Sequence, residues 1–355
     1  TRSIDDFYHG TRAGISGGTT MVCDFVIPAR GQSILEAYKI WREKSDHMAL
    51  SDFTFHMALT WWDESVARDI ETVVKEYGIN SFKMFMAYNG VLRMYDNEIL
   101  EACKVIRKYG GIAQMHAENG DVVAMEQKRL VCELCITGPE GHYMSRPEDV
   151  EAEATKRALM LGHRTNCPMY IVHVMSKQAA EMVLDAKKQG VVCYGEPIAA
   201  SLGTSGKHYC HNCWRHAAAF VMSPPLRLDD STPKYLMDLL GCGLLDLTGT
   251  DNCTFNANQK ALGKDDFRKI PNGVNGIEDR MSVIWEKGVY AGKMTPERFV
   301  AVTSTTAARI FNMYPKKGVI QAGSDADIGF GVCRIFFSEL VHSDCVATQV
   351  LQTIH

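Results

Sequence analysis

Residues 81–116 read SFKMFMAYNGVLRMYDNEILEACKVIRKYGGIAQMH and pass from a strand-like pattern to a helix-like one and back. Residues 81–86 and 112–116 are short, mostly apolar runs, as buried strands are. Between them, Asp96 can cap a helix that ends near Gly110. Because two strands joined by a helical crossover run parallel, this stretch predicts a βαβ unit.

The same alternation continues on both sides of this unit. Further strand-like runs lie at residues 18–26, 53–59, 169–174, 191–194 and 244–248, and most precede a helical pattern. Repeated βα units over 355 residues predict an α/β fold, a (β/α)8 TIM-like barrel. Only seven strands are predicted, and the chain opens with a helix-like run from Ile4 to about Ile15. We therefore expect the first barrel strand to lie upstream of Thr1.

Composition argues against several classes of protein. The formal net charge is −4 and no long basic run is present, which disfavours nucleic-acid and anionic-membrane partners. No apolar run approaches the roughly 18 residues of a membrane span, and the N-terminus lacks the apolar core of a signal peptide. The 12 cysteines form no regular framework, and their two Cys-x-x-Cys pairs lie too far apart for an ordinary zinc site. We expect reduced thiols and a cytoplasmic protein.

Four polar residues lie in or just after four different predicted strands: Lys83, His116, His173 and Asp251. The carboxyl ends of barrel strands surround one pocket, so these side chains are candidates for a shared site. Each also has an ordinary explanation, as a hydrogen-bonded core histidine, a snorkelling lysine or a turn aspartate. Those explanations would have to hold at four strand ends at once. His56 and His163 are not grouped with other candidate ligands, and we interpret them as structural.

These residue types suit a metal site. Neutral imidazole and carboxylate are both good zinc ligands. A lysine ammonium has three donors and no acceptor, so Lys83 can bind metal only after modification. Carboxylation of its amine gives a carbamate, whose two oxygens can bridge metal ions about 3.5–4 Å apart.

Six segments of the chain resemble the dihydropyrimidinase and hydantoinase family of cyclic amidohydrolases. The likeness runs from Ser3 to about Ile328. The segments that carry it are SFKMFMAY (81–88), QMHAENG (114–120), IVHVMS (171–176), GEPIAASLG (195–203), TDNCTFN (250–256) and IPNG (270–273). The resemblance implies a homotetramer with two zinc ions per subunit.

The resemblance also assigns metal ligands. Lys83 would be the bridging carbamate, and His116 and His173 would bind the second metal ion. Asp251 would bind the first ion and shuttle a proton. The family places a further His-x-His pair at the end of its first barrel strand, and no His-x-His occurs in this chain.

The implied reaction is hydrolysis of the cyclic amide bond of 5,6-dihydrouracil or dihydrothymine to N-carbamoyl-β-amino acids, a step of pyrimidine degradation. The attacking group would be a hydroxide that bridges the two zinc ions. Tyr88 would donate to the developing oxyanion. Ser223 and Asn272 would hold the ring amide through main-chain groups. Asp251 would pass a proton to the leaving ring nitrogen.

Two departures from the family pattern bear on activity. The missing His-x-His pair agrees with the missing first strand, and we do not expect His208, His211 or His216, in a polar loop, to replace it. The family continues into a small β-sandwich after its barrel, whereas residues 329–355 match nothing in the family. We therefore expect a barrel at residues 1–328, an aberrant tail at 329–355, and poor or no activity of this polypeptide by itself.

Two alternatives remain open. The collapsin response mediators, relatives of this enzyme family, keep the fold, lose metal ligands and act as non-enzymatic scaffolds. Retention of the four candidate ligands argues against that interpretation, and bound zinc would decide it. A hydantoinase or allantoinase would share the site and differ in the ring it accepts, which a comparison of turnover would decide.

Overall fold

The computed structural model describes residues 2–332, 345–348 and 351–353. Strands and helices alternate over the first 200 residues, as the sequence predicted. The order is α1 (Phe7–Ser16), β1 (Met21–Val26), α2 (Ile34–Asp46), β2 (Asp52–Ala58), α3 (Glu64–Tyr77), β3 (Ser81–Phe85), α4 (Asp96–Lys108), β4 (Ile112–His116), α5 (Gly120–Cys132), α6 (Glu140–Met144), α7 (Glu148–Thr165), β5 (Met169–Ile171), α8 (Lys177–Lys188), β6 (Cys193–Gly195) and α9 (Ala199–Gly203).

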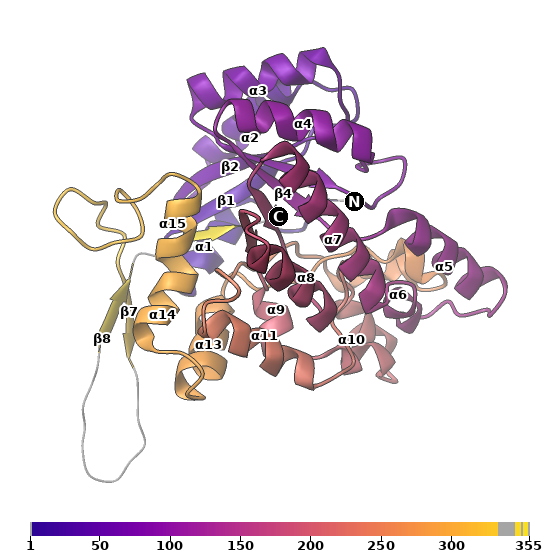
Figure 1. Ribbon diagram of the computed structural model, residues 1–355. Helices are drawn as coiled ribbons and strands as arrows, with labels where there is room; N and C mark the ends of the chain where they lie inside the picture. The colour runs from indigo at the N-terminus through magenta and orange to yellow at the C-terminus, as the bar shows by residue number, and fades with distance from the viewer. Residues whose placement is uncertain (1, 333–344, 349–350, 354–355) are drawn as a thin grey trace, which may run out of the picture.

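The second half of the chain is mainly helical. Its helices are α10 (Trp214–Ala219), α11 (Ser231–Gly241), α12 (Ala257–Lys260), α13 (Arg280–Ile284), α14 (Pro296–Val300) and α15 (Thr306–Ile310). A π-helical turn at Ala301–Thr305 joins α14 to α15, so the two form one continuous helix. Strands β7 (Gly329–Val332) and β8 (Cys345–Thr348) pair antiparallel and lie away from the main body (Figure 1).

The main sheet is parallel and has the order β6-β5-β4-β3-β2-β1-β9. Consecutive strands are neighbours, and the register sets Lys83 of β3 opposite Gln114 of β4. Strand β9 (Leu351–Thr353) pairs with β1 at the edge where we expected an earlier strand. Of the predicted tail, residues 333–344, 349–350 and 354–355 lie outside the described part of the chain. The order of β1 to β6 is that of a barrel built from βα units.

The predicted strand at residues 244–248 was wrong as a regular element. Next to this segment the structure has only an isolated parallel bridge, between Ile198 and Gly249, among the described residues. The backbone of Asp246 donates to Gly195 O at 3.1 Å, as a ladder would require. However, the Gly195 N–H donates to the Asp246 carboxylate, at 2.8 Å, and not to a backbone carbonyl. A side chain thus takes the place of a ladder hydrogen bond.

Side-chain hydrogen bonds cap several of the helices. Ser176 caps α8 by accepting from Ala179 N, and Thr295 caps α14. Asp96 was predicted as a cap but is the first residue of α4, and its carboxylate pairs with Arg157 at 2.7 Å. The opening helix starts at Phe7, because the Asp6 side chain accepts from His9 N and so forms its N-cap.

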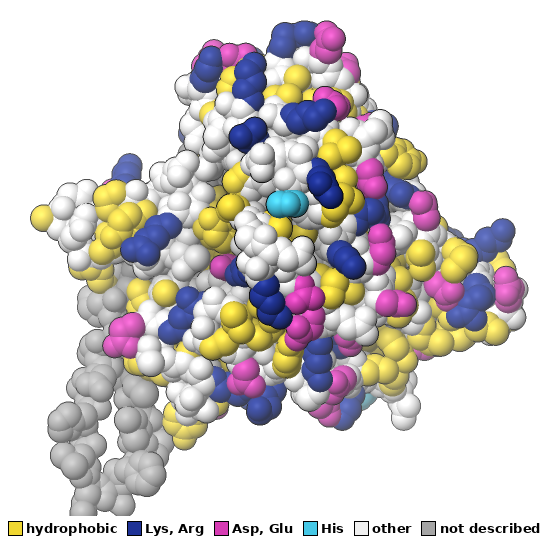
Figure 2. Space-filling view, in the orientation of Figure 1, with side chains coloured by type: hydrophobic (Ala, Val, Ile, Leu, Met, Phe, Trp, Pro, Cys, Tyr) yellow, Lys and Arg dark blue, Asp and Glu magenta, His cyan; other side chains and the backbone are white. Residues whose placement is uncertain are grey.

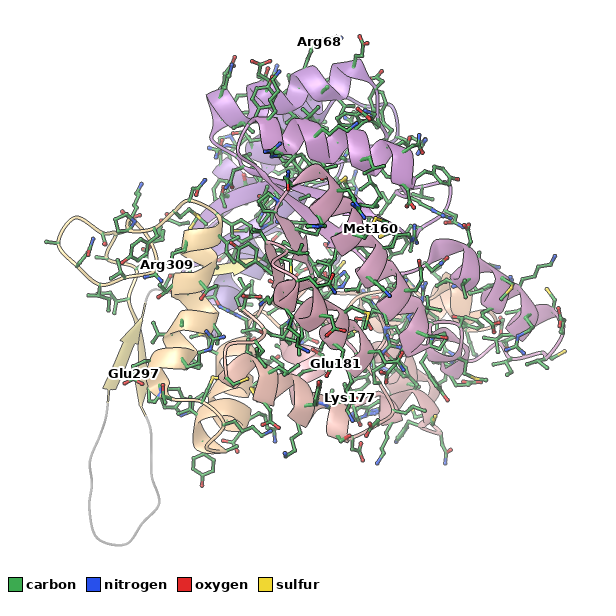
Figure 3. All side chains as sticks on the ribbon, viewed as in Figure 1. Arg68, Met160, Lys177, Glu181, Glu297 and Arg309 are labelled. Carbon is green, nitrogen blue, oxygen red and sulfur yellow. The ribbon has the colours of Figure 1, made fainter. Side chains whose placement is uncertain are left out.

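Amphipathic helices cover the sheet with an apolar face. Helices α2, α3 and α4 group together, and α7 and α8 run side by side in front of the sheet (Figure 1). On the face shown in Figure 2, cationic and anionic side chains are interspersed. Lys177 and Glu181 lie on α8 in this outer layer (Figure 3) and bind Asp229 and Tyr235, which fixes α8 against the α11 region.

The C-terminal part of the described barrel region is fastened by one lysine. Lys317 is almost fully buried and pairs with Asp52 at the start of β2, with Asp325 at 2.9 Å and with Asp327. Three carboxylates around one ammonium raise the pKa of Lys317 despite its burial. This group, the Lys317 cluster, ties residues 317–327 to the sheet.

Candidate active site

The four candidate metal ligands come from neighbouring strands and lie at one edge of the sheet. Lys83 is in β3, and His116 ends β4. His173 follows β5 by two residues, and Asp251 follows the bridge at Gly249. Lys83 interacts electrostatically with Asp251 and with both histidines. The structure therefore brings all four side chains together.

The two histidines face one another through specific ring nitrogens. His116 Nδ1 lies 2.9 Å from His173 Nε2. The other nitrogen of His116, Nε2, lies 2.8 Å from Glu118 Oε2. A carboxylate behind a ligand histidine fixes which nitrogen faces the metal. Burial lowers the pKa of both rings, which favours the neutral form that a metal requires.

Glu118 is itself held by a buried arginine. Arg146 Nη1 lies 3.4 Å from Glu118 Oε2. Burial raises the pKa of Glu118, but the Arg146 charge and the His116 hydrogen bond outweigh burial and lower it to about 2. Glu118 is therefore an anion that orients His116. Sequence analysis did not single out Glu118 or Arg146. An acid two positions after the strand residue His116 is a signal from which the role of Glu118 was predictable.

Two aromatic rings lie beside the buried amine of Lys83. Its Nζ is 4.8 Å from the centre of the Phe25 ring and 5.2 Å from that of Phe85. Burial lowers the pKa of Lys83, while Asp251 and Glu196 act in the opposite direction. A neutral lysine amine has a lone pair, which is the form that reacts with carbon dioxide. The surroundings of Lys83 thus favour the form that carboxylation needs.

Two carboxylates share this environment. Burial raises the pKa of Asp251, against the effect of Lys83. Burial likewise raises the pKa of Glu196 to about 7. Glu196 Oε2 accepts from the Tyr170 hydroxyl at 2.6 Å, while its Oε1 has no hydrogen-bond partner within the described residues. Sequence analysis assigned Glu196 no role beyond its place in the family-like segment at residues 195–203.

A separate group of acidic side chains lies close together away from the four candidates. Within the described ranges, the trio of acidic, histidine or cysteine ligand atoms that lie within 4.8 Å of one another is Asp52, Asp325 and Asp327. Lys317 already neutralises that trio. His116, His173 and Asp251 form no such trio.

Tyr88 stands beside the histidine pair. Its ring centre is 5.0 Å from that of His116, and its hydroxyl shares a hydrogen bond with the Ser223 side chain. Burial raises the pKa of Tyr88 to about 12. The phenol is thus protonated near neutral pH and available as a donor. Ser223 Oγ also lies 3.5 Å from His142 Nε2, and His142 contacts Met222 O at 2.7 Å.

Asn272 lies in a loop that is bonded to the Ser223 segment. Gly273 N donates to Val221 O at 3.0 Å. Gly273 has φ +149, and a Cβ there would lie 2.4 Å from Cys253 O. Only glycine permits this close approach. The candidate substrate-binding segments therefore lie against each other and against the turn that follows Asp251.

Three site residues have left-handed backbones: Tyr88 (φ 62), His173 (φ 39) and Asp251 (φ 51). Such conformations cost roughly 1–2 kcal/mol for a residue other than glycine. Backbone strain of this kind concentrates where function needs an unusual side-chain direction. No pattern in the sequence marks these angles.

The residues interpreted as structural take part in other contacts. His56 Nδ1 contacts Ser81 Oγ at 2.5 Å within the sheet. His208 Nδ1 lies 3.0 Å from His216 Nε2, and the His208 ring stacks on Phe220. The Cys-x-x-Cys residues are exposed free thiols: Cys132, Cys135, Cys210 and Cys213. Of the helices in the described ranges, none is both long and apolar enough to cross a membrane.

Comparison with known proteins identifies the family to which the chain belongs. The profile of the amidohydrolase family matches residues 5–330. The chain belongs to the amidohydrolase family, in its dihydropyrimidinase and hydantoinase group. The crystal structure of dihydropyrimidinase from Brevibacillus agri has a TM-score of 0.90 and 38% sequence identity, covering 92% of this chain and 71% of that one.

Particular relatives are closer in sequence. The chain is 58% identical over 328 residues to the dihydropyrimidinase of Rattus norvegicus, covering 92% of this chain and 63% of that protein. It is 47% identical over 325 residues to dihydropyrimidinase-related protein 5 of Homo sapiens, covering 92% of this chain and 57% of that protein. The chain thus spans less than two thirds of the length of these relatives.

Proposed function

We propose that this chain carries the catalytic barrel of a metal-dependent cyclic-amide hydrolase that opens dihydropyrimidine rings. One observation carries the proposal: His116 Nδ1 and His173 Nε2 face each other at 2.9 Å beside the buried amine of Lys83. Two neutral imidazoles and a lysine with a lowered pKa suit a metal centre better than a hydrophobic core. The similarity to the rat dihydropyrimidinase supports the substrate class.

The side chains present fit a pair of zinc ions. Lys83, as a carbamate, would hold both ions, His116 and His173 one of them, and Asp251 the other. Glu196 Oε1 is buried and has no hydrogen-bond partner among the described residues, and positive charge nearby, such as a bound cation, would favour its ionised form. When bound, the metal ions supply a water of lowered pKa and polarise the substrate carbonyl.

The remaining residues act on the ring amide. The neutral Tyr88 hydroxyl donates to the carbonyl oxygen as negative charge develops there. Main-chain groups of Ser223 and Asn272 hold the ring amide in place. The Asp251 carboxylate takes a proton from the attacking water and gives it to the leaving ring nitrogen, as the carbon–nitrogen bond breaks. Burial, which favours the protonated form of Asp251, suits this exchange.

The wider properties follow from the same proposal. We infer a homotetramer in the cytoplasm, with residues 1–328 as the catalytic body, to which β9 of the tail adds an edge strand. The 355-residue polypeptide by itself is poorly active in this proposal, because the chain contains no His-x-His pair.

The deciding experiment measures metal and turnover together in the full-length protein. We expect bound zinc and faster hydrolysis of dihydrouracil and dihydrothymine than of hydantoin or allantoin. Faster turnover of hydantoin or allantoin would change the proposed substrate class and leave the proposed reaction type unchanged. Absence of both zinc and turnover would instead support a non-enzymatic scaffold, the alternative that the similarity to dihydropyrimidinase-related protein 5 keeps open.

A further inference from the structure

Lys260 is a buried lysine outside the proposed metal centre. It ends the short helix α12 and is 4% exposed. Its Nζ donates to three backbone carbonyls: Pro271 O at 2.7 Å, Val221 O at 2.8 Å and Gly273 O at 2.9 Å. An ammonium has three N–H donors, so all of them are used. All three N–H groups of the Lys260 ammonium therefore bond to backbone carbonyls.

The three carbonyls belong to the two segments that would bind the substrate. Val221 lies two residues before Ser223, while Pro271 and Gly273 flank Asn272. The segments are joined directly by the hydrogen bond from Gly273 N to Val221 O. Lys260 therefore spans the pair of loops that would hold the ring amide through main-chain groups.

Packing alone does not fix this loop. A hollow of about 450 Å³ lies on one side of it, and Lys260, Gly273, Val274 and Asn275 form part of the wall. A cavity provides no van der Waals contacts that would hold a backbone in place. The hollow is also lined by Arg215 and His216, and none of its described lining residues is acidic. Hydrogen bonds therefore hold this part of the loop: the three from the Lys260 ammonium, and the backbone bonds from Gly273 N to Val221 O and from Cys253 N to Val274 O.

We propose that Lys260 is a positioning residue, whose ammonium sets the spacing between the Ser223 and Asn272 segments so that both can hold one ring amide. This inference rests on the proposed function for its substrate. Lys260 does not touch the reacting atoms. A shift of either segment by about 1 Å is enough to cost on the order of a hundredfold in rate.

The charge state of Lys260 offers an independent readout. Burial lowers the pKa of Lys260 to about 8, with Cys253 nearby acting in the opposite direction. His142 and Phe255 also face the ammonium, and Arg215 and His216 line the hollow. Above the pKa the neutral amine has two N–H groups for three carbonyls. We expect KM to rise with pH in this range.

The test compares Lys260→Met, Lys260→Arg and a control, Lys264→Met, in the zinc-loaded full-length protein. Lys264 is exposed and lies four residues further along the chain. Lys260→Met should raise KM for dihydrouracil about tenfold or more, the effect of losing hydrogen bonds from a charged group, with unchanged zinc content. Lys260→Arg should restore part of the loss and abolish the rise of KM above pH 8. Wild-type KM in Lys260→Met overturns the proposal.

Amide hydrogen exchange separates this inference from the proposed function. In Lys260→Met, exchange should become faster in residues 219–224 and 270–276, including the Gly273 amide, and stay unchanged in the control and elsewhere. If the wild-type protein opens none of the rings, the proposed function fails, and exchange still decides whether Lys260 holds the loops. Unchanged exchange at Gly273 in Lys260→Met overturns the inference. If exchange becomes faster throughout Lys260→Met, the variant is misfolded, and Lys260→Arg becomes the deciding variant.

Discussion

His116 Nδ1 and His173 Nε2 lie 2.9 Å apart, although 57 residues separate them in the sequence. The parallel register of β4 and β5 produces this contact, because both side chains leave the same edge of the sheet. Glu118 fixes the orientation of the first ring from behind. The arrangement leads to the following predictions.

Replacing His173 by Asn should remove one metal ion. The proposed metal centre gives the histidine pair to one ion and Asp251 to the other, so the variant should lose the ion at the histidine pair and retain part of the ion at Asp251. Metal analysis of the purified full-length protein measures this directly. His163→Asn, at an exposed position on α7, is the matched control. Full zinc content in His173→Asn would contradict the assignment of this histidine.

Replacing Glu118 by Gln should weaken both metal binding and the fold. Loss of a carboxylate behind a ligand histidine typically costs 10–100-fold in metal affinity, so we expect about that loss here. The pKa of Glu118 is lowered to about 2, so its ionised form stabilises the fold above its ordinary pKa. That contribution, about 3 kcal/mol by linkage, is lost as the pH falls toward 2.

Urea unfolding of the metal-free protein tests the pH dependence. The free energy of unfolding of wild type and Glu118→Gln should differ most near pH 7 and converge as the pH drops from about 5 toward 2. Glu76→Gln, at an exposed site on α3, should follow the wild-type curve. A difference that does not change with pH would show that the carboxylate charge is not what stabilises the fold.

Replacing Tyr88 by Phe should lower kcat and leave KM nearly unchanged. The variant keeps the ring that packs on His116 and removes only the hydroxyl. Loss of one oxyanion donor costs about 10²–10³ in kcat. Steady-state kinetics with dihydrouracil measure this, with the exposed Tyr95→Phe as control. If Tyr88→Phe and Tyr95→Phe lowered kcat equally, or if Tyr88→Phe changed KM alone, Tyr88 would not be a hydrogen-bond donor to the transition state.

Replacing Lys317 by Met should lower the melting temperature. It removes the ammonium that neutralises Asp52, Asp325 and Asp327. The carboxylates are partly exposed and screened by solvent, so we expect a loss of about 1–2 kcal/mol. Lys316→Met removes an exposed lysine next to it and should have little effect. The difference between the two should shrink in about 1 M salt, where the screening length is near 3 Å.

Much of the fold follows from local patterns. Strands at 81–86 and 112–116 were predicted within a residue of Ser81–Phe85 and Ile112–His116, because buried parallel strands are short apolar runs with helices between them. The strand at 244–248 failed because the Asp246 side chain takes the N–H of Gly195, a tertiary contact that apolar periodicity does not encode.

The candidate site was predictable where polar residues interrupt apolar strands. Lys83, His116 and His173 stand out for that reason. Lys260 and Arg146 did not, since they lie outside strands and act through partners far away in sequence, 39 residues for Lys260 and Val221. Such contacts exist only in three dimensions.

The left-handed backbones of Tyr88, His173 and Asp251 have a consequence for protein engineering. Glycine adopts these angles without strain, so glycine at each position should relieve roughly 1 kcal/mol of backbone energy while it deletes the chemistry. At Asp251, whose buried carboxylate is itself unfavourable, selection for heat resistance alone would favour loss of the reactive group, whereas at Tyr88 and His173 the cavity left by the deleted ring opposes the backbone gain. Directed evolution of this chain has to screen for turnover at every round.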